Sequence, residues 1–204
     1  MTLIQNQGIE AVDVVFPIEG QYLARDHALA LRQTLCRLLP WLETDAEAGI
    51  HPIKLVPGTD SPALLSRRSL LLLRVAPQRV PALSALAGLD LMVAGQRLHL
   101  CAAHLRELQA HATLYAYKVA ADSADEVVFM AELARELAAL GIVGERVCGM
   151  HQVLSLTNGV VNTFSLMLHA LPPDQSLHLQ HRGIGPHRLL GCGIFIPHKS
   201  AAAV

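Results

Sequence analysis

The sequence predicts an α+β protein made of two similar units that follow one another along the chain. Three observations lead to this prediction. Strand-like apolar segments recur in both halves, each half also holds two helical segments, and the order of these segments is the same in both halves. With 204 residues, of which 52% are hydrophobic and 16% charged, the chain can bury a core in each unit.

In the first half, a strand is expected at Ala11–Pro17, and Pro17 and Gly20 should end it. Apolar residues at helical spacing predict a helix over Leu23–Leu39, which Pro40 terminates. The remaining expected segments are Ile50–Val56, a strand at Ser69–Val75, a brief helix at Gln78–Ala87 and a hairpin of Leu89–Val93 with Gln96–Leu100.

The second half repeats this order. Its expected segments are a strand at Thr113–Ala120 with Tyr115 and Tyr117 on one face, a helix at Asp125–Leu140, strands at Arg146–Leu156 and Val160–His169 around the turn Asn158-Gly159, a helix from Pro172-Pro173 to His181, and a strand at Leu190–Pro197. Each half therefore has the order β-α-β-β-α-β, which is the ferredoxin-like order. We expect two domains, 1–104 and 113–204, with a linker around Ala102–Ala112.

A glycine-rich segment precedes the last expected strand. It reads Gly183-Ile184-Gly185-Pro186-His187-Arg188-Leu189-Leu190-Gly191-Cys192-Gly193. Paired glycines allow a backbone to approach a phosphate closely, and Arg188 and His187 add a permanent cation and a group that titrates near neutrality. The segment is neither a dinucleotide fingerprint nor a Walker A loop. A tight helix-to-strand turn is the alternative explanation.

Composition and charge limit the function classes. A net charge of −1 argues against a general nucleic-acid coat protein, although eleven histidines can add positive charge as the pH falls. The four cysteines show no C-x-x-C spacing and no signal peptide is evident, so we expect reduced thiols in the cytoplasm. No apolar run approaches the ~20 residues of a membrane span, and no membrane association is expected.

Four segments together resemble one protein superfamily. They are Asp26-His27 heading a helix that ends Arg37-Leu38-Leu39-Pro40, the stretch Gly49-Ile50-His51-Pro52-Ile53, the stretch Leu65-Ser66-Arg67-Arg68-Ser69-Leu70, and the glycine-rich segment through Pro197. With two ferredoxin-like units in tandem, the chain resembles the RAMP superfamily of CRISPR-associated proteins. Within it, the chain is similar to the repeat-processing endoribonucleases of the MYXAN subtype.

This resemblance implies cleavage of CRISPR repeat stem-loops in precursor RNA without a metal or another cofactor. A ribose 2′-hydroxyl would attack the adjacent phosphate and leave a 2′,3′-cyclic phosphate and a 5′-hydroxyl. The reaction needs a base, an acid and cations that stabilise the phosphate. The resemblance also implies that the enzyme retains the 3′ hairpin and can join other CRISPR effector subunits.

The resemblance assigns catalytic roles to three residues. His27, near the start of the first long helix, would be the general base, and the helix N-terminus would disfavour its charged form. His51 would be the acid or would position the phosphate, and Tyr22 would orient the 2′-hydroxyl or the phosphate. The structural alternatives are a hydrogen-bonded histidine on the inner face of a helix for His27, a turn-capping histidine for His51 and a packing role for Tyr22.

RNA contacts are expected from two regions. Arg67 or Arg68 would clamp the scissile phosphate, and only one of them is expected to face the RNA because neighbouring residues of a strand point to opposite faces. The contacts expected in the glycine-rich segment are Arg182, Gly183, Gly185, His187, Arg188, Gly191 and Gly193. His178 and His181 have the spacing of paired metal ligands, but no recognisable ligand set surrounds them and no metal is expected.

Two other functions are compatible with these segments. A non-catalytic RAMP subunit that binds guide RNA would share the fold and the glycine-rich segment without needing His27. A ferredoxin-like regulatory module would instead bind a small ligand between its halves. The near-neutral net charge favours the module, whereas the Arg/His tip of the glycine-rich segment argues against it.

Overall fold

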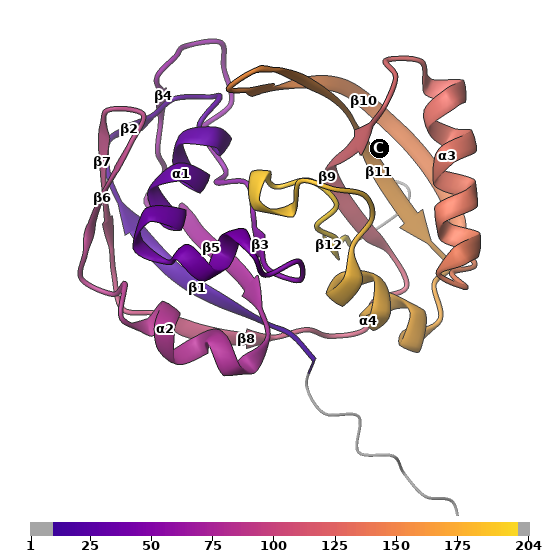
Figure 1. Cartoon of the computed structure of the whole chain (residues 1–204), viewed down its shortest axis with the longest axis horizontal. Coiled ribbons are helices and arrows are strands. Elements are labelled where there is room, and N and C mark those ends of the chain that lie inside the picture. The colour runs from indigo at the N-terminus through magenta and orange to yellow at the C-terminus, as the bar shows by residue number, and fades with distance from the viewer. Residues whose placement is uncertain (1–9, 200–204) are drawn as a thin grey trace, which may run out of the picture.

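Two antiparallel β-sheets, one from each half of the chain, form the framework of the molecule (Figure 1). The structure is a computed structural model, and it describes residues 10–199. The strands of the first sheet are β3 (Gly49–Ile50), β5 (Leu70–Val75), β1 (Val12–Glu19), β7 (Gln96–Leu100) and β6 (Asp90–Val93), with β8 (His104–Glu107) also paired to β1. Those of the second sheet are β10 (Glu145–Leu156), β11 (Gly159–His169), β9 (Leu114–Ala121) and β12 (Ile196–Pro197). A separate ribbon joins β2 (Tyr22–Leu23) to β4 (Ala63–Leu64).

Both sheets have the ferredoxin-like strand order. In the second sheet, the first strand of the half (β9) lies between the third (β11) and the fourth (β12), and the second (β10) forms the edge. The first sheet follows the same order with β1 at its centre, β5 and β3 on one side, and β7 and β8 on the other. The predicted fold class is therefore confirmed.

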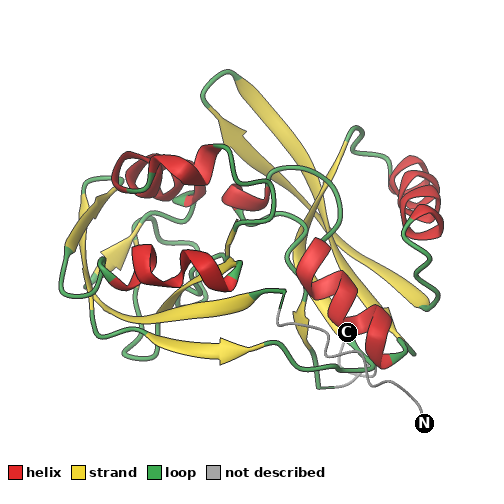
Figure 2. Ribbon diagram, turned by 60° about the horizontal axis from the view of Figure 1, so that its bottom comes forward, coloured by secondary structure: helices red, strands yellow, loops and turns green. Residues whose placement is uncertain are grey.

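Helices cover one face of each sheet and bury its apolar side chains. They are α1 (Ala28–Leu38), α2 (Val80–Ser84), α3 (Glu126–Ala139) and α4 (Pro173–Arg182), and the short 3₁₀ turns are η1 (Pro40–Glu43), η2 (Pro77–Arg79) and η3 (Arg188–Leu190). The α1 helix packs Leu31 and Leu35 into the first core, whereas α3 stacks Phe129 on Phe164 in the second. Figure 2 shows α3 on the far side of the second sheet, away from the first half. Within residues 10–199, no helix is long and apolar enough to cross a membrane.

Several elements begin or end at other residues than the sequence predicts. The first strand continues through Pro17 to Glu19, because Pro17 faces Cys101, where β7 and β8 are themselves interrupted. The α1 helix begins only at Ala28, since Leu23 pairs with Ala63 as a strand. The segment expected over Ile50–Val56 keeps only Gly49–Ile50 as a strand, and Pro52 follows after one residue.

Two further differences concern the predicted linker and the last strand. The segment Ala102–Ala112 contains β8, whose four residues pair with Val12–Val15 of β1, so the first sheet extends to Glu107. The last strand is shorter than predicted because Leu190 belongs to η3 and the glycines after it have positive φ values. Only Ile196–Pro197 pair with β9. The division into two domains at these boundaries stays a prediction.

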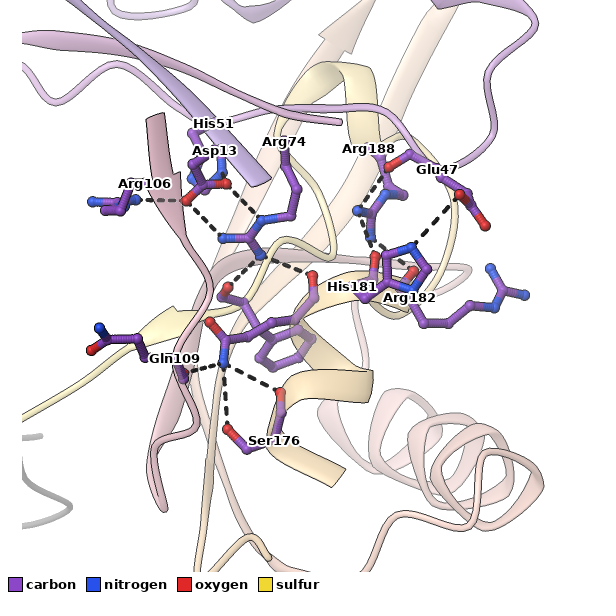
Figure 3. A network of polar contacts seen from close by, with 12 residues as sticks. Asp13, Glu47, His51, Arg74, Arg106, Gln109, Ser176, His181, Arg182 and Arg188 are labelled. Carbon is purple, nitrogen blue, oxygen red and sulfur yellow. Dashed lines mark hydrogen bonds and ion pairs between the residues drawn. The ribbon is translucent and has the colours of Figure 1, made fainter. Parts of the chain in front are cut away.

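A buried ion pair joins the first sheet to the second half of the chain (Figure 3). Asp13 of β1 and Arg74 of β5 face each other in register, and both are 1% exposed. Arg74 donates from Nε and Nη2 to the carboxylate over 2.8 and 3.1 Å. Its Nη1 donates to the carbonyl oxygens of Gln180 at 2.9 Å and Phe195 at 2.8 Å. Each buried charge is thus paired and hydrogen-bonded, as an ion in a protein interior must be.

Candidate functional site

His27 lies at the junction of the two halves, at the N-cap of α1. Its ring is 6% exposed, and Nδ1 lies 2.9 Å from the carbonyl oxygen of Ala24. A carbonyl only accepts, so Nδ1 carries the proton and Nε2 holds the lone pair in the neutral ring. Burial lowers the pKa of His27, and the charge of Lys118 lowers it further. The geometry therefore supplies a neutral imidazole with one basic nitrogen at physiological pH.

A small cavity of about 30 Å³ adjoins His27, and we call it the histidine cavity. This volume is close to that of one water molecule, so the residues around it are near neighbours. Its lining consists of Arg25, Asp26, His27, Ala28, Leu31, Ile50, His51, Pro52, Lys118, Leu189 and Leu190. The structure thus brings His27 and His51 together, and it adds Lys118 from the second half.

Lys118 is the residue at this site that the sequence reasoning missed. The chain has three lysines, and Lys118 is the one inside an apolar strand. It follows Tyr115 and Tyr117 and interrupts their alternation with Leu114 and Ala116. A cation that breaks the period-two pattern of a strand was the available signal.

His51 belongs to the buried network around Asp13. Its Nε2 lies 3.3 Å from Asp13 Oδ1, and Arg106 donates to the other carboxylate oxygen at 2.7 Å (Figure 3). Burial alone would raise the pKa of Asp13, but hydrogen bonds from His51 and Arg74 and the charge of Arg74 hold it well below its usual range. Burial lowers the pKa of His51 to about 4, with the charge of Arg74 acting in the same direction and the bond to Asp13 opposing it. A neutral histidine bonded to a carboxylate is a poor proton donor, which favours a structural role over the expected acid.

Tyr22 lies in the two-stranded ribbon, opposite Leu64. Its side chain is 36% exposed and lies outside the lining of the histidine cavity. Tyr22 therefore does not adjoin the histidine cavity, and its expected role in orienting the 2′-hydroxyl or the phosphate stays a prediction.

Arg188 occupies a different position from the one expected. Its side chain is 7% exposed and donates from Nη1 to the carbonyl of Arg182 and from Nη2 to those of His181 and Glu47 (Figure 3). Burial lowers its pKa to about 10, so it stays charged at neutral pH. In this structure the donors of Arg188 join α4 to the first half, so they are engaged within the protein, and the expected contact with the RNA backbone stays a prediction.

The glycines of the loop serve close packing inside the protein. At Gly193 (φ 65°), a Cβ would collide with the carbonyl of Ile184, and at Gly183 (φ 68°) it would collide with Arg188 and the carbonyl of Gly193. Gly191 packs against Pro52. At Gly185 an added Cβ would make only an ordinary contact with the carbonyl of Ala120, but the Gly185 N–H donates to Glu136 Oε1 at 2.9 Å. The expected phosphate contacts of Gly183, Gly191 and Gly193 conflict with this packing, since all three are buried.

Two exposed residues of the same region, Arg182 and His187, line a hollow of about 570 Å³ that we call the loop hollow. It lies between the glycine-rich segment, α1, η1 and the turn of the β10–β11 hairpin. Arg32 of α1 lines it as well, together with the carboxylates of Glu43 and Asp45. Of the predicted loop contacts, Arg182 and His187 remain free to reach a ligand at this surface.

A larger hollow of about 970 Å³, which we call the central groove, lies between the two sheets. The cations and aromatic rings in its lining are Lys54, Arg68, Arg74, Arg106, His51, His111 and Tyr117. Of its two carboxylates, Asp13 is neutralised by Arg74, which leaves Glu107. Arg68 lines the groove and Arg67 does not, although both are exposed. Both arginines lie in a turn before β5, so the rule that neighbouring residues of a strand point to opposite faces does not apply to them.

Comparisons with known proteins give one consistent result. A sequence model of the family described as Cas6 Crispr matches residues 12–200. The chain is 35% identical over 194 residues to the CRISPR-associated endonuclease Cas6 of Myxococcus xanthus. The aligned region covers 95% of this chain and 84% of that protein.

Solved structures share the fold at low sequence identity. A CRISPR-associated protein Cas6 superposes with a TM-score of 0.66 at 8% identity, covering 93% of this chain and 99% of the other. A Cas6-related protein from Pyrococcus furiosus gives 0.61 at 9% identity, covering 93% and 98%. The Cse3 protein of Thermus thermophilus, solved with an RNA that represents a pre-cleavage complex, gives 0.54 at 14% identity, covering 92% and 98%.

The packing of the glycine-rich segment leads to a stability prediction. Gly193→Ala should lower the free energy of unfolding by about 3 kcal/mol, because it combines a positive φ with a backbone collision. Gly88→Ala is the matched control, since Gly88 has φ 82° with no atom within 4 Å of an added Cβ; it should cost about 1 kcal/mol. Urea denaturation measures both, and equal losses would show that the Gly193 contact is unimportant.

The lowered pKa of His51 predicts a dependence of stability on pH. Its pKa is about 4 in the folded protein against 6.5 for an ordinary histidine. The unfolded chain therefore binds a proton between these values that the folded protein does not, and the free energy of unfolding should fall as the pH drops from 6.5 toward 4.

His51→Gln should reduce the slope of that part of the stability curve, to which the lowered pKa of His27 also contributes, whereas His187→Gln, at an exposed position, should leave it unchanged. Urea denaturation at a series of pH values gives the slopes. An unchanged slope in His51→Gln would show that another group is responsible.

Proposed function

Because this chain belongs to the Cas6 family of CRISPR endoribonucleases, we propose that it cuts repeat stem-loops in precursor CRISPR RNA by attack of a ribose 2′-hydroxyl on the adjacent phosphate. The products are a 2′,3′-cyclic phosphate and a 5′-hydroxyl. The reaction needs no metal, since the nucleophile is part of the substrate and a side chain can take its proton.

His27 is the general base in this proposal. The observation that carries it is the bond from Nδ1 to Ala24, which leaves Nε2 as the basic nitrogen of a buried ring. A base works best when its pKa lies near the working pH, and burial keeps His27 neutral there. The 2′-hydroxyl proton passes to Nε2, the bond from phosphorus to the 5′-oxygen breaks, and that oxygen takes a proton from solvent.

The loop hollow and the central groove supply the RNA contacts. Arg182 and His187 offer exposed donors in the first, and Lys54, Arg68 and Arg106 do so in the second. Phosphate contacts of this kind position an RNA without reading its sequence, and a stem-loop is recognised largely by its shape. This distribution supports RNA binding by a protein with a net charge of only −1.

We also propose that the 3′ hairpin stays bound after the cut and that the complex can join other CRISPR effector subunits. Cleavage breaks one bond of the backbone and leaves the phosphates of the stem in place. Contacts made to the stem therefore persist in the product, and release is slow whenever they supply most of the affinity.

The test begins with the purified protein and the repeat RNA of its own locus in EDTA. A single cut at the 3′ base of the hairpin with a cyclic phosphate end is expected. Tight binding without a cut would identify a non-catalytic guide-RNA subunit. An absence of binding would favour the regulatory module.

His27→Ala should lower the single-turnover cleavage rate by about 10²–10⁴-fold, because that is the contribution of a general base. The affinity for the RNA should change less than about threefold, since the base acts in the transition state. His169→Ala is the control, a histidine of β11 that pairs with Glu145 outside the site. Normal cleavage by His27→Ala would remove His27 from the mechanism.

Arg68 and Arg67 form a matched pair for the central groove. Arg68→Ala should weaken binding several-fold and reduce the slope of log Kd against log[salt] by about 1, the loss of one phosphate contact. Arg67→Ala should change neither value much, because Arg67 does not line the groove. The probe is repeat RNA with a 2′-deoxy sugar at the cut, so binding is measured without cleavage. If the two substitutions changed the affinity and the salt slope equally, the central groove would not be the surface that binds the RNA.

A further inference from the structure

Lys118 and His27 come from opposite halves of the chain and meet at the histidine cavity. We propose that Lys118 is a catalytic residue of the cleavage site, where its ammonium stabilises the negative charge that develops on the phosphate oxygens. This inference rests on the proposed function, since it adds a second group to the same reaction. It makes the active site a composite that exists only when the two halves are docked.

The positive charge of Lys118 is not neutralised by the residues that the structure describes. Among the residues described, its ammonium takes part in no hydrogen bond or ion pair, although the side chain is half-buried. Arg25, the other cation of the lining, donates to the carbonyls of Asp60 at 2.7 Å and Val56 at 3.3 Å. A partly buried cation without a protein partner is available for an anionic ligand.

The backbone of β9 is irregular at Lys118. In β9, residues 117 and 118 lie opposite the single residue Ser165, in a β-bulge between the pairs Ala116–Leu166 and Val119–Phe164. A bulge redirects side chains out of the regular alternation. Tyr117 accordingly reaches the central groove, while Lys118 reaches the histidine cavity.

The glycine-rich segment then fixes this bulge from the other side. Gly193 donates its N–H to the carbonyl of Lys118 at 2.7 Å, and the carbonyl of Gly193 accepts from the N–H of Ile184 at 3.3 Å. Position 193 has to be glycine because a Cβ there would collide with Ile184. The glycine-rich segment, whose sequence suggests a phosphate site, thus fixes the backbone of Lys118.

The charges around His27 agree with this role. Arg25 and Asp26 face it from the segment before α1, His51 from the segment after β3, and Lys118 from β9, while η3 contributes only leucines. His51 is neutral and bonded to Asp13, so it adds no charge. The charge of Lys118 therefore has two effects: it disfavours the protonated form of His27, and it attracts the phosphate.

The chemical step is balanced without a further reactant. The 2′-oxygen bonds to phosphorus and its proton passes to Nε2 of His27, while charge grows on the non-bridging oxygens beside Lys118. The bond to the 5′-oxygen then breaks, that oxygen takes a proton from water, and His27 returns its proton to solvent. Lys118 keeps its proton throughout and acts as a fixed charge.

The experiment measures single-turnover cleavage of the repeat hairpin at saturating protein in EDTA, with the full chain. Lys118→Met should lower the rate by about 10²-fold, as the loss of one charge-stabilising donor does, and Lys118→Arg should retain most of the activity. Lys199→Met is the control, because Lys199 is exposed and lies outside the lining of the histidine cavity, the loop hollow and the central groove. Cleavage by Lys118→Met within threefold of the parent rate would overturn the proposal.

A second measurement needs no RNA. NMR titration of the free protein should show the pKa of His27 higher in Lys118→Met than in the parent and unchanged in Lys199→Met, with His27→Gln assigning the signal. An unmoved pKa would overturn the pairing of the two residues even if the cleavage rate fell. Should the parent itself not cut the RNA, the proposed function fails, and this titration still decides whether Lys118 acts on His27. If Lys118→Met does not fold, Lys118→Gln and Lys118→Arg replace it in both measurements.

Discussion

The buried bond between Arg74 and Asp13 is the interaction on which the arrangement of this molecule depends. Two charges taken out of water are costly unless each is fully bonded, and here every strong partner is present. Asp13 accepts hydrogen bonds from Arg74, Arg106 and His51. The remaining nitrogen of Arg74, Nη1, donates to two carbonyls of the second half. Directional bonds of this kind fix one docking geometry, which hydrophobic contact alone would not. The groups that meet near His27 are therefore placed by a network several residues away.

Arg188 repeats this principle at the other side of the junction. It too is an arginine with little exposure whose donors end on backbone carbonyls, one of them the carbonyl of Glu47 in the first half. The glycines beside it remove the side chains that would separate the segments. Arginine and glycine together, which in a loop suggest a phosphate site, here build a close backbone junction. The same residue types serve both purposes because both require donors and close approach.

The sequence predicted the parts of the fold that local rules govern. The α3 helix, the turn at Asn158-Gly159 and the alternation in β9 up to Tyr117 follow from hydrophobic period and turn chemistry, and the structure confirms them. Contacts between distant segments were not predictable in this way. Nothing near Arg188 in the sequence shows that Glu47 lies beside it, and nothing near Lys118 indicates His27. The strand β8 was missed for the same reason, since its pattern is exposed throughout and only pairing with β1 defines it.

A site shared between two docked halves has a consequence for how the enzyme can lose activity. Each half has its own core, with Leu31 and Leu35 in one and Phe129 and Phe164 in the other. Damage to the junction can therefore separate His27 from the second half while both sheets remain folded. Such a protein would keep its helical and sheet content and the cations of each surface, yet it would hold the base apart from any group that the second sheet supplies. Stability of a half and competence of the site are thus distinct properties in this fold, and the charged junction connects them.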